Sequence, residues 1–189
     1  MREIYKLRRS IRKFKQKQVD KELLKEIIED VRFAPSGNNK QALKYVVVTN
    51  KDTCDTIAEN IIFAALLPRN IAAQKADERA AAYIVILEPE DGGRVQDIDM
   101  GIAADIITTS ACEKGLGSCM MLNFNAEKIS KILNISDKWK PAMVIPVGYP
   151  AHKSFVEDAD RDGSTAYYTD ENGDYHVPKK ILDDITIWF

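Results

Sequence analysis

The chain has 189 residues and nearly balanced charges, with 27 Lys and Arg against 29 Asp and Glu and a formal net charge of −2. This length is sufficient for one domain with a substantial core. The charge balance argues against a general nucleic-acid binder, which needs a basic surface. No run approaches the roughly 18 consecutive apolar residues of a membrane helix. The three cysteines, Cys54, Cys112 and Cys119, are too few and too scattered for a disulfide framework, which favours a cytoplasmic location.

The first half of the chain alternates helical and extended patterns. Residues 19–34 predict a helix, because Asp20 can cap its N-terminus and aliphatic residues form one stripe. The sequence PSGNNKQ, residues 35–41, predicts a loop. A buried strand is expected at Tyr45–Thr49, and a second helix is expected over residues 51–67.

The middle of the chain predicts strands around one apolar helix. Ala81–Leu87 reads as a strand, and Asp97–Gly115 is apolar nearly all round, which predicts a central, buried helix. Gly115 and Gly117 suit the C-terminal cap of that helix. Three further elements are expected: a short strand at Ser118–Leu122, a helix at 125–135 and a strand at Ala142–Gly148.

The C-terminal residues 151–189 have a different pattern. Asn172-Gly173 lies between aromatic and β-branched residues, which predicts a hairpin within 167–177. Pro178 is expected to open a last segment that ends on three large apolar residues, Ile187, Trp188 and Phe189. These three side chains are expected to be buried, either on the chain's own core or against a partner chain. Residues 1–189 as a whole predict a single α+β domain with one central sheet.

The segment RRSIRKF, Arg8 to Phe14, has the most distinctive composition. If it is extended, Arg8, Ser10 and Arg12 share one face and Ile11 can anchor the other face to the core. Two guanidinium groups with a hydroxyl between them can hold a small phosphate. The segment alone is also compatible with a solvated basic surface.

Two later stretches carry polar groups that suit a heterocyclic ligand. The loop PSGNNKQ contains amide side chains that donate and accept hydrogen bonds, although a plain turn explains the loop alone. The stretch GLGSCMMLNF, residues 115–124, can offer backbone N–H groups, and alone it reads as core. Cys119 in this stretch is expected to pack rather than react.

In this order, the segments RRSIRKF, APSGNNKQ, DMGIAADIITTSACEKGLGSCMM and PVGYP resemble the nitroreductase family of flavoproteins. The resemblance covers residues 2–185. It implies a nitroreductase-like α+β fold with a central mixed or antiparallel sheet flanked by helices. It also implies a homodimer with FMN at each subunit interface and with the C-terminal residues 151–189 exchanged onto the partner subunit.

The resemblance assigns roles in FMN binding to particular residues. The residues expected to hold the phosphate and ribityl chain are Arg8, Arg9, Ser10, Arg12, Lys179 and Lys180. The loop residues expected to reach the flavin ring of the partner subunit are Pro35, Ser36, Gly37, Asn39 and Gln41. The residues expected near N5 and O4 of the ring are Met121, Leu122 and Asn123.

The chain departs from the family pattern at two places near the expected flavin. Ala42-Leu43 stands where the family often has Pro-Trp, and Leu122-Asn123 stands where Gly-Gly is common. Larger side chains at the second place are expected to narrow the pocket or shift a backbone donor. Residues 63–80, where relatives place a substrate lid, receive no role from the sequence.

The activity that the resemblance implies is hydride transfer from NADH or NADPH, through flavin N5, to a nitroaromatic, a quinone or a similar acceptor. Hydride transfer needs no protein acid or base, so no catalytic residue is named. No metal site is expected, because His152 and His176 lie far apart and away from cysteines. The alternatives are a flavin-binding protein without NAD(P)H turnover (a sensor, a store, or a flavin-consuming or dehalogenating enzyme) and a basic-arm nucleic-acid binder, which the pI of about 5.8 disfavours.

Overall fold

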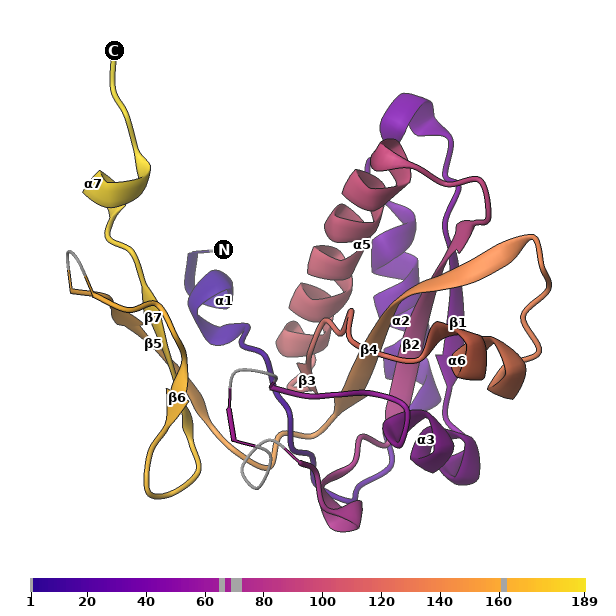
Figure 1. Cartoon of the computed structure of the whole chain (residues 1–189), viewed down its shortest axis with the longest axis horizontal. Helices are drawn as coiled ribbons and strands as arrows, with labels where there is room; N and C mark the ends of the chain where they lie inside the picture. Colours follow the sequence, from indigo (N-terminus) through magenta and orange to yellow (C-terminus); the bar gives the residue numbers. More distant parts are fainter. Residues whose placement is uncertain (1, 65–66, 69–72, 161–162) are drawn as a thin grey trace.

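The computed structural model describes residues 2–64, 67–68, 73–160 and 163–189, which form two β-sheets with helices (Figure 1). The larger sheet has four strands in the order β1-β2-β4-β3, and all neighbouring strands are antiparallel. Its strands are β1 (Lys44–Val48), β2 (Ala82–Pro89), β4 (Trp139–Gly148) and β3 (Gly117–Ser118). This arrangement confirms the predicted α+β class with a central sheet.

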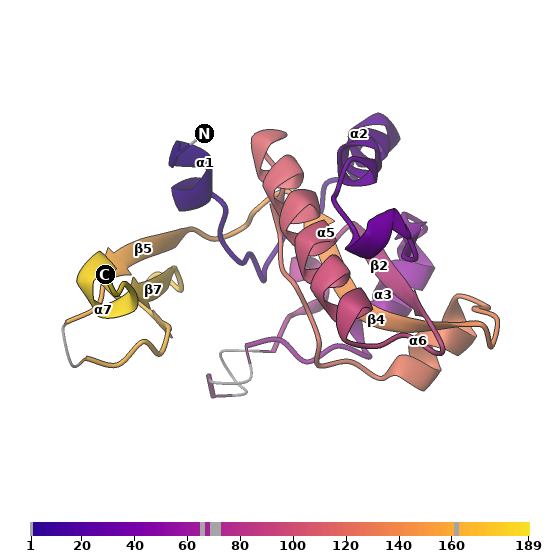
Figure 2. The same cartoon turned by 90° about the horizontal axis from the view of Figure 1, so that it is seen from above.

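Helices cover both faces of the four-stranded sheet (Figure 2). On one face lie α2 (Lys21–Arg32) and α5 (Arg94–Glu113), and on the other lie α3 (Lys51–Ala58) and α6 (Ala126–Ile132). Successive side chains of β2 therefore enter opposite halves of the core, and β2 reads as an uninterrupted apolar run. In the described part of the chain, no helix is long and apolar enough to cross a membrane.

The helix α5 ends as expected but starts earlier and is less buried. Gly115, just beyond its end, has φ of 72°, a left-handed conformation in which glycine carries no Cβ penalty. The helix starts at Arg94 rather than Asp97, because the Gln96 side chain accepts the N–H of the capping residue Gly93. Val95 and Ile98 are 45% and 55% exposed, so the expectation of burial all round is wrong for the first half of α5.

Two predicted elements are shorter in the structure. The helix expected over 51–67 ends at Ala58, because Ile61 leaves the helix and forms a β-bridge with Phe124 in the core; residues 65–66 lie outside the described part. The strand expected at Ser118–Leu122 is limited to β3 plus one isolated bridge between Met121 and Val144. Gly117 belongs to β3 and not to the cap of α5.

The C-terminal sheet has the order β5-β7-β6 and lies beside α1 in Figure 1. β6 (Tyr168–Thr169) and β7 (Tyr175–Lys179) form the predicted hairpin, and β5 (Ser154–Asp158) adds a parallel neighbour to β7. Pro178 lies inside β7 rather than after it. The chain continues into α7 (Leu182–Ile185), and its last three side chains are at least 80% exposed in this single chain.

The segment that follows α1 (Arg2–Leu7) is attached along the edge of the central sheet. Ile11 N–H donates to Ser118 O at 2.8 Å, and Phe14 N–H donates to Glu78 O at 2.9 Å in η2 (Ala76–Glu78). The Ile11 and Phe14 side chains are buried in the core. Ser10 pairs in parallel with Ser118, so the sheet becomes mixed at this edge.

The extended conformation predicted for the segment RRSIRKF holds from Ser10 onward. Arg8 follows directly on α1 and continues its hydrogen-bond pattern, because the Arg8 N–H donates to Ile4 O at 2.8 Å. The alternation of side chains therefore does not extend back to Arg8.

Gly117 is required where this segment meets β3. A Cβ on Gly117 would lie 2.7 Å from Ile11 Cβ and Cγ1, closer than real side chains approach. We therefore expect Gly117→Ala to lower the free energy of unfolding in urea by about 1–3 kcal/mol through overpacking.

Gly101→Ala is the matched control for Gly117→Ala. No atom lies within 4 Å of a Cβ added at Gly101, on the exposed side of α5. That substitution should raise the free energy of unfolding by about 0.5–1 kcal/mol, because alanine is the better helix former. Equal effects of the two substitutions would contradict the close contact at Gly117.

Candidate functional site

Arg8 and Arg9 each retain a buried donor with no acceptor. Arg8 Nη2 forms an ion pair with Asp105 Oδ1 of α5 at 3.3 Å, and Arg9 Nη2 donates to Tyr5 O at 2.6 Å. The Nε atoms of both arginines are buried and have no hydrogen-bond partner among the described residues. Leaving a buried donor unsatisfied costs about 1–3 kcal/mol. The two Nε–H groups therefore fit a ligand that brings anionic oxygens.

Arg12 is held by neutral groups rather than by a carboxylate. Its guanidinium carbon lies 4.8 Å from the centre of the Tyr167 ring and 4.9 Å from that of Tyr175. The backbone N–H of Arg12 donates to His152 Nε2 at 2.9 Å, and the backbone carbonyl of Arg12 accepts from the Gln74 side-chain amide. Within the described ranges, no acidic side chain lies within ion-pair distance of Arg12.

Cys119 lies beside this basic segment as a packing residue. It is 5% exposed, and burial raises the pKa of its thiol although Arg12 and Ser10 favour the thiolate. A thiol that stays protonated is a poor nucleophile.

Three residues after β3 differ in whether their backbone N–H group already forms a hydrogen bond. Met121 is buried, and its N–H donates to Val144 O at 2.9 Å. Leu122 is 67% exposed, and Asn123 is also exposed and accepts the Ile62 N–H through its carbonyl. If backbone N–H groups bind a ligand here, Leu122 and Asn123 can supply them, whereas the N–H of Met121 is already used.

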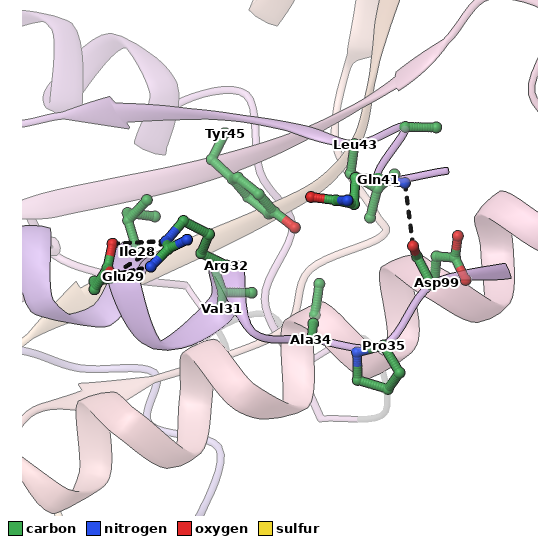
Figure 3. Close-up of a pocket in the computed structure, with 13 residues that line it drawn as sticks. Ile28, Glu29, Val31, Arg32, Ala34, Pro35, Gln41, Leu43, Tyr45 and Asp99 are labelled. Atoms are coloured by element: carbon green, nitrogen blue, oxygen red, sulfur yellow. Dashed lines mark hydrogen bonds and ion pairs between the residues drawn. The ribbon is translucent and has the colours of Figure 1, made fainter. Parts of the chain in front are cut away.

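The loop of residues 35–41 contains a strained turn. Asn38, Asn39 and Gln41 have φ of 52°, 54° and 48°, in the left-handed region that non-glycine residues rarely adopt. Within the loop, Gln41 N–H donates to Ser36 Oγ at 3.1 Å (Figure 3). Backbone strain of this kind occurs often at binding sites, where the surrounding structure holds it in place.

Asp99 of α5 anchors this loop and is a residue that the sequence analysis missed. Its Oδ1 accepts the N–H of Gly37, in η1 (Gly37–Asn39), at 2.9 Å. The side chain is only 5% exposed, and its Oδ2 is buried without a partner among the described residues. A Cβ on Gly37 would collide with Val95 Cγ1, so glycine permits the close approach of loop and helix. An acidic residue within an apolar helical run was the available signal.

A small cavity of about 250 Å³ lies between α2, the loop and α5. In Figure 3 the Tyr45 ring extends from β1 toward Gln41 across this cavity. Burial, with Asp99 contributing, raises the pKa of the Tyr45 phenol, so the group stays neutral. At the edge of the cavity, Arg32 is already paired with Glu29 of α2.

Within one chain, the loop of residues 35–41 lies apart from the segment Arg8 to Arg12. The loop lies between α2 and β1 at the top of Figure 1, whereas the segment from Arg8 to Arg12 lies between α1 and β3. Within the segment group, Ser10 meets Ser118 directly. Lys179 and Lys180, at the end of β7, are exposed, and their ammonium groups pair with no described residue. The arrangement thus offers a basic site to which the chain's own loop does not contribute.

His152, just before the C-terminal sheet, forms a hydrogen bond with Arg12 that requires one particular tautomer of its ring. A neutral ring with its proton on Nδ1 donates to Lys153 O at 2.8 Å and accepts the Arg12 N–H at Nε2. Burial is the main cause that lowers the pKa of His152. Protonation would direct an Nε2–H at the Arg12 N–H, so the folded chain favours the neutral ring.

We expect the free energy of unfolding to fall as the pH drops below about 6.5, the ordinary histidine pKa. Because the folded-state pKa of His152 is the lower one, its contribution is complete above that pH and is lost on acidification. Urea denaturation between pH 5 and pH 7.5 measures this, and His152→Ala should flatten the slope. His176→Ala is the control. The hydrogen bond to Glu157 raises the pKa of His176, so this residue contributes with the opposite sign and its removal should not flatten the slope. The proposed role of His152 fails if His152→Ala leaves the slope unchanged.

The sequence of the chain also matches a known protein family. A model described as "Nitroreductase family" matches residues 5–149. A Methanothermobacter thermautotrophicus protein with the provisional name NADH dehydrogenase/NAD(P)H nitroreductase is 30% identical over 164 residues, 82% of this chain and 80% of that protein. An iodotyrosine deiodinase of Haliscomenobacter hydrossis is 25% identical over 185 residues, 84% of this chain and 83% of that protein.

Solved structures of two clostridial proteins share the fold. A nitroreductase family protein of Clostridium novyi aligns with a TM-score of 0.68 and 31% identity, covering 79% of this chain and 84% of that one. An FMN-dependent nitroreductase of Clostridium difficile aligns with a TM-score of 0.68 and 27% identity, covering 86% and 92%. The family match spans most of the chain and includes the segment with Arg8 and Arg12. The chain therefore belongs to the nitroreductase family.

Proposed function

We propose that this chain is an FMN-dependent oxidoreductase that transfers hydride from NADH or NADPH to a nitroaromatic, a quinone or a similar small acceptor. The observation that carries the proposal is the basic segment. Among the described residues, the buried Nε–H groups of Arg8 and Arg9 have no acceptor, and Arg12 has no carboxylate partner. A phosphate monoester carries up to two negative charges and accepts several hydrogen bonds, which fits this set of donors. The FMN-dependent relative supports the choice of cofactor.

In this proposal, the donors of Arg8, Arg9, Ser10 and Arg12 bind the phosphate and ribityl chain. Lys179 and Lys180 add positive charge from the C-terminal sheet, where both side chains are exposed. The backbone N–H groups of Leu122 and Asn123 would donate to the ring edge, next to the buried Met121 in the sequence. When bound, FMN supplies the hydride chemistry itself. The residues of the chain bind and orient it, and none is assigned as acid or base.

We further propose that the site is completed by a second copy of the chain. The loop with Pro35, Ser36, Gly37, Asn39 and Gln41 is held away from the basic segment of its own chain, so it serves the flavin of the partner. Exposed apolar side chains at Val95 and Ile98 of α5 and at the chain end suit a dimer interface. Within the C-terminal region 151–189, Tyr167 and Tyr175 stay on Arg12 of their own chain, while the chain end after β7 packs on the partner. A cytoplasmic location and small-molecule partners, without nucleic acid or membrane, belong to the same proposal.

The visible spectrum of the purified protein tests the proposed activity. We expect the bands of oxidised flavin, their loss on anaerobic addition of NADH or NADPH, and their return with a quinone or nitroaromatic acceptor. Heat-denatured protein should release FMN rather than FAD. A colourless protein that also fails to take up added FMN would contradict the proposal.

Mixing two inactive variants tests the shared site. Arg8→Ala/Arg12→Ala lacks the phosphate donors, and Ser36→Ala/Asn39→Ala alters the loop. Because each heterodimer would contain one site with both halves intact, co-refolded mixtures should recover part of the reductase activity, up to about one quarter of wild type for random pairing. The control mixes each variant with itself. No recovery in a mixture that forms dimers by light scattering would place loop and arginines in one chain.

A second candidate function follows from the iodotyrosine deiodinase relative. That protein's name describes removal of iodine from a tyrosine, and a similar activity would also use a bound flavin. A yellow protein whose bands persist with NADH and NADPH, yet fade with another reductant, would favour a dehalogenase, a sensor or a store over a nitroreductase.

A further inference from the structure

The Arg12 guanidinium lies against an aromatic clamp formed by Tyr167 and Tyr175. Its carbon is 4.8 Å and 4.9 Å from the two ring centres, distances at which a cation is attracted to an aromatic ring. The clamp belongs to the C-terminal region, beyond the residues 5–149 that match the family model. The family pattern therefore does not account for it.

The aromatic clamp holds the guanidinium of Arg12, and no carboxylate of the described residues neutralises its charge. Arg8, by contrast, is paired with the carboxylate of Asp105, and Lys13 is paired with Glu78 at 3.1 Å. Ring faces attract a guanidinium but take up few of its N–H donors, so most of these donors have no partner among the described residues. The one hydrogen bond of the Arg12 guanidinium to a described residue, from Nη1 to Ser10 O, is long at 3.4 Å.

The clamp is itself fixed by the surrounding structure. Tyr175 is 1% exposed, lies in β7, and packs on the His152 ring at 4.7 Å between centroids. Tyr167 packs on Tyr175 at 6.2 Å. The backbone of Arg12 is bound from both sides by His152 and Gln74. A long flexible side chain is thus held in one place before any ligand arrives, which reduces the entropy lost on binding.

We propose that Tyr167 and Tyr175 are positioning residues that hold the Arg12 guanidinium ready for the phosphate of the cofactor. This inference rests on the proposed function, because it takes FMN as the ligand. The two tyrosines touch Arg12 and not the cofactor, so their effect on binding passes through that guanidinium. The C-terminal region thereby contributes to the phosphate site of its own chain.

The test compares the dissociation constants of FMN and riboflavin, which differ only in the phosphate, by quenching of flavin fluorescence. We expect wild type to prefer FMN strongly. Tyr167→Leu/Tyr175→Leu removes both ring faces and should weaken FMN binding by roughly threefold to thirtyfold, with riboflavin binding changed less than about twofold. Tyr167→Phe/Tyr175→Phe keeps the ring faces and should retain the wild-type preference. Since Tyr175 is buried, Tyr167→Leu alone is the milder variant and should weaken FMN binding about threefold.

A double-mutant cycle separates positioning from general damage. Arg12→Ala should lose much of the preference for FMN, and adding the two leucine substitutions to it should change that preference no further. Equal weakening of FMN and riboflavin by the leucine variants would mean a structural role only, and an unchanged FMN constant would also overturn the inference. If wild type binds neither flavin, both the proposed function and this inference fail. If wild type binds FMN and the leucine variants leave the preference for FMN unchanged, the inference alone fails.

Discussion

Ile11 and Phe14 fix the arginine segment to the core, and the candidate site depends on this attachment. Both side chains are buried, and backbone hydrogen bonds from Ile11 and Phe14 join the segment to β3 and to η2. Gly117 makes the contact close enough, because no side chain fits between β3 and Ile11. Apolar burial worth a few kcal/mol can thereby hold Arg8, Arg9 and Arg12 on the surface of a chain whose net charge is negative.

The three arginines are held in ways that leave donors for an anion. For comparison, the exposed Arg32 pairs with the carboxylate of Glu29. Within the part of the chain that the structure describes, Arg8 alone of the three has a carboxylate partner. Arg9 donates to a backbone carbonyl, and Arg12 packs against aromatic rings. The buried Nε–H groups of Arg8 and Arg9 have no acceptor among the residues that the structure describes. A phosphate-bearing ligand would satisfy these groups, whereas water alone would leave the clustered positive charge uncompensated.

The sequence predicted those parts of the molecule that depend on local patterns. The strands β1, β2 and β4 were expected within a few residues of their bounds, because apolar runs bounded by polar residues mark buried strands. The helix α3 was overestimated, since the apolar residues after Ala58 are buried by tertiary contacts and not by a helix. Short α1 and β5 left no periodic signal. The contacts of Arg12 with His152, 140 positions away, and of Asp99 with Gly37 depend on the completed fold, so no local pattern could indicate them.

We propose that the segment from Arg8 to Arg12 binds the phosphate of FMN. A crystal structure of the chain grown with FMN tests it most directly. We expect the phosphate oxygens within hydrogen-bond distance of the Arg8 and Arg12 guanidinium groups, with the partner's loop against the ring. A phosphate bound elsewhere, with Arg12 contacting only the two tyrosines, would contradict this role of the arginines.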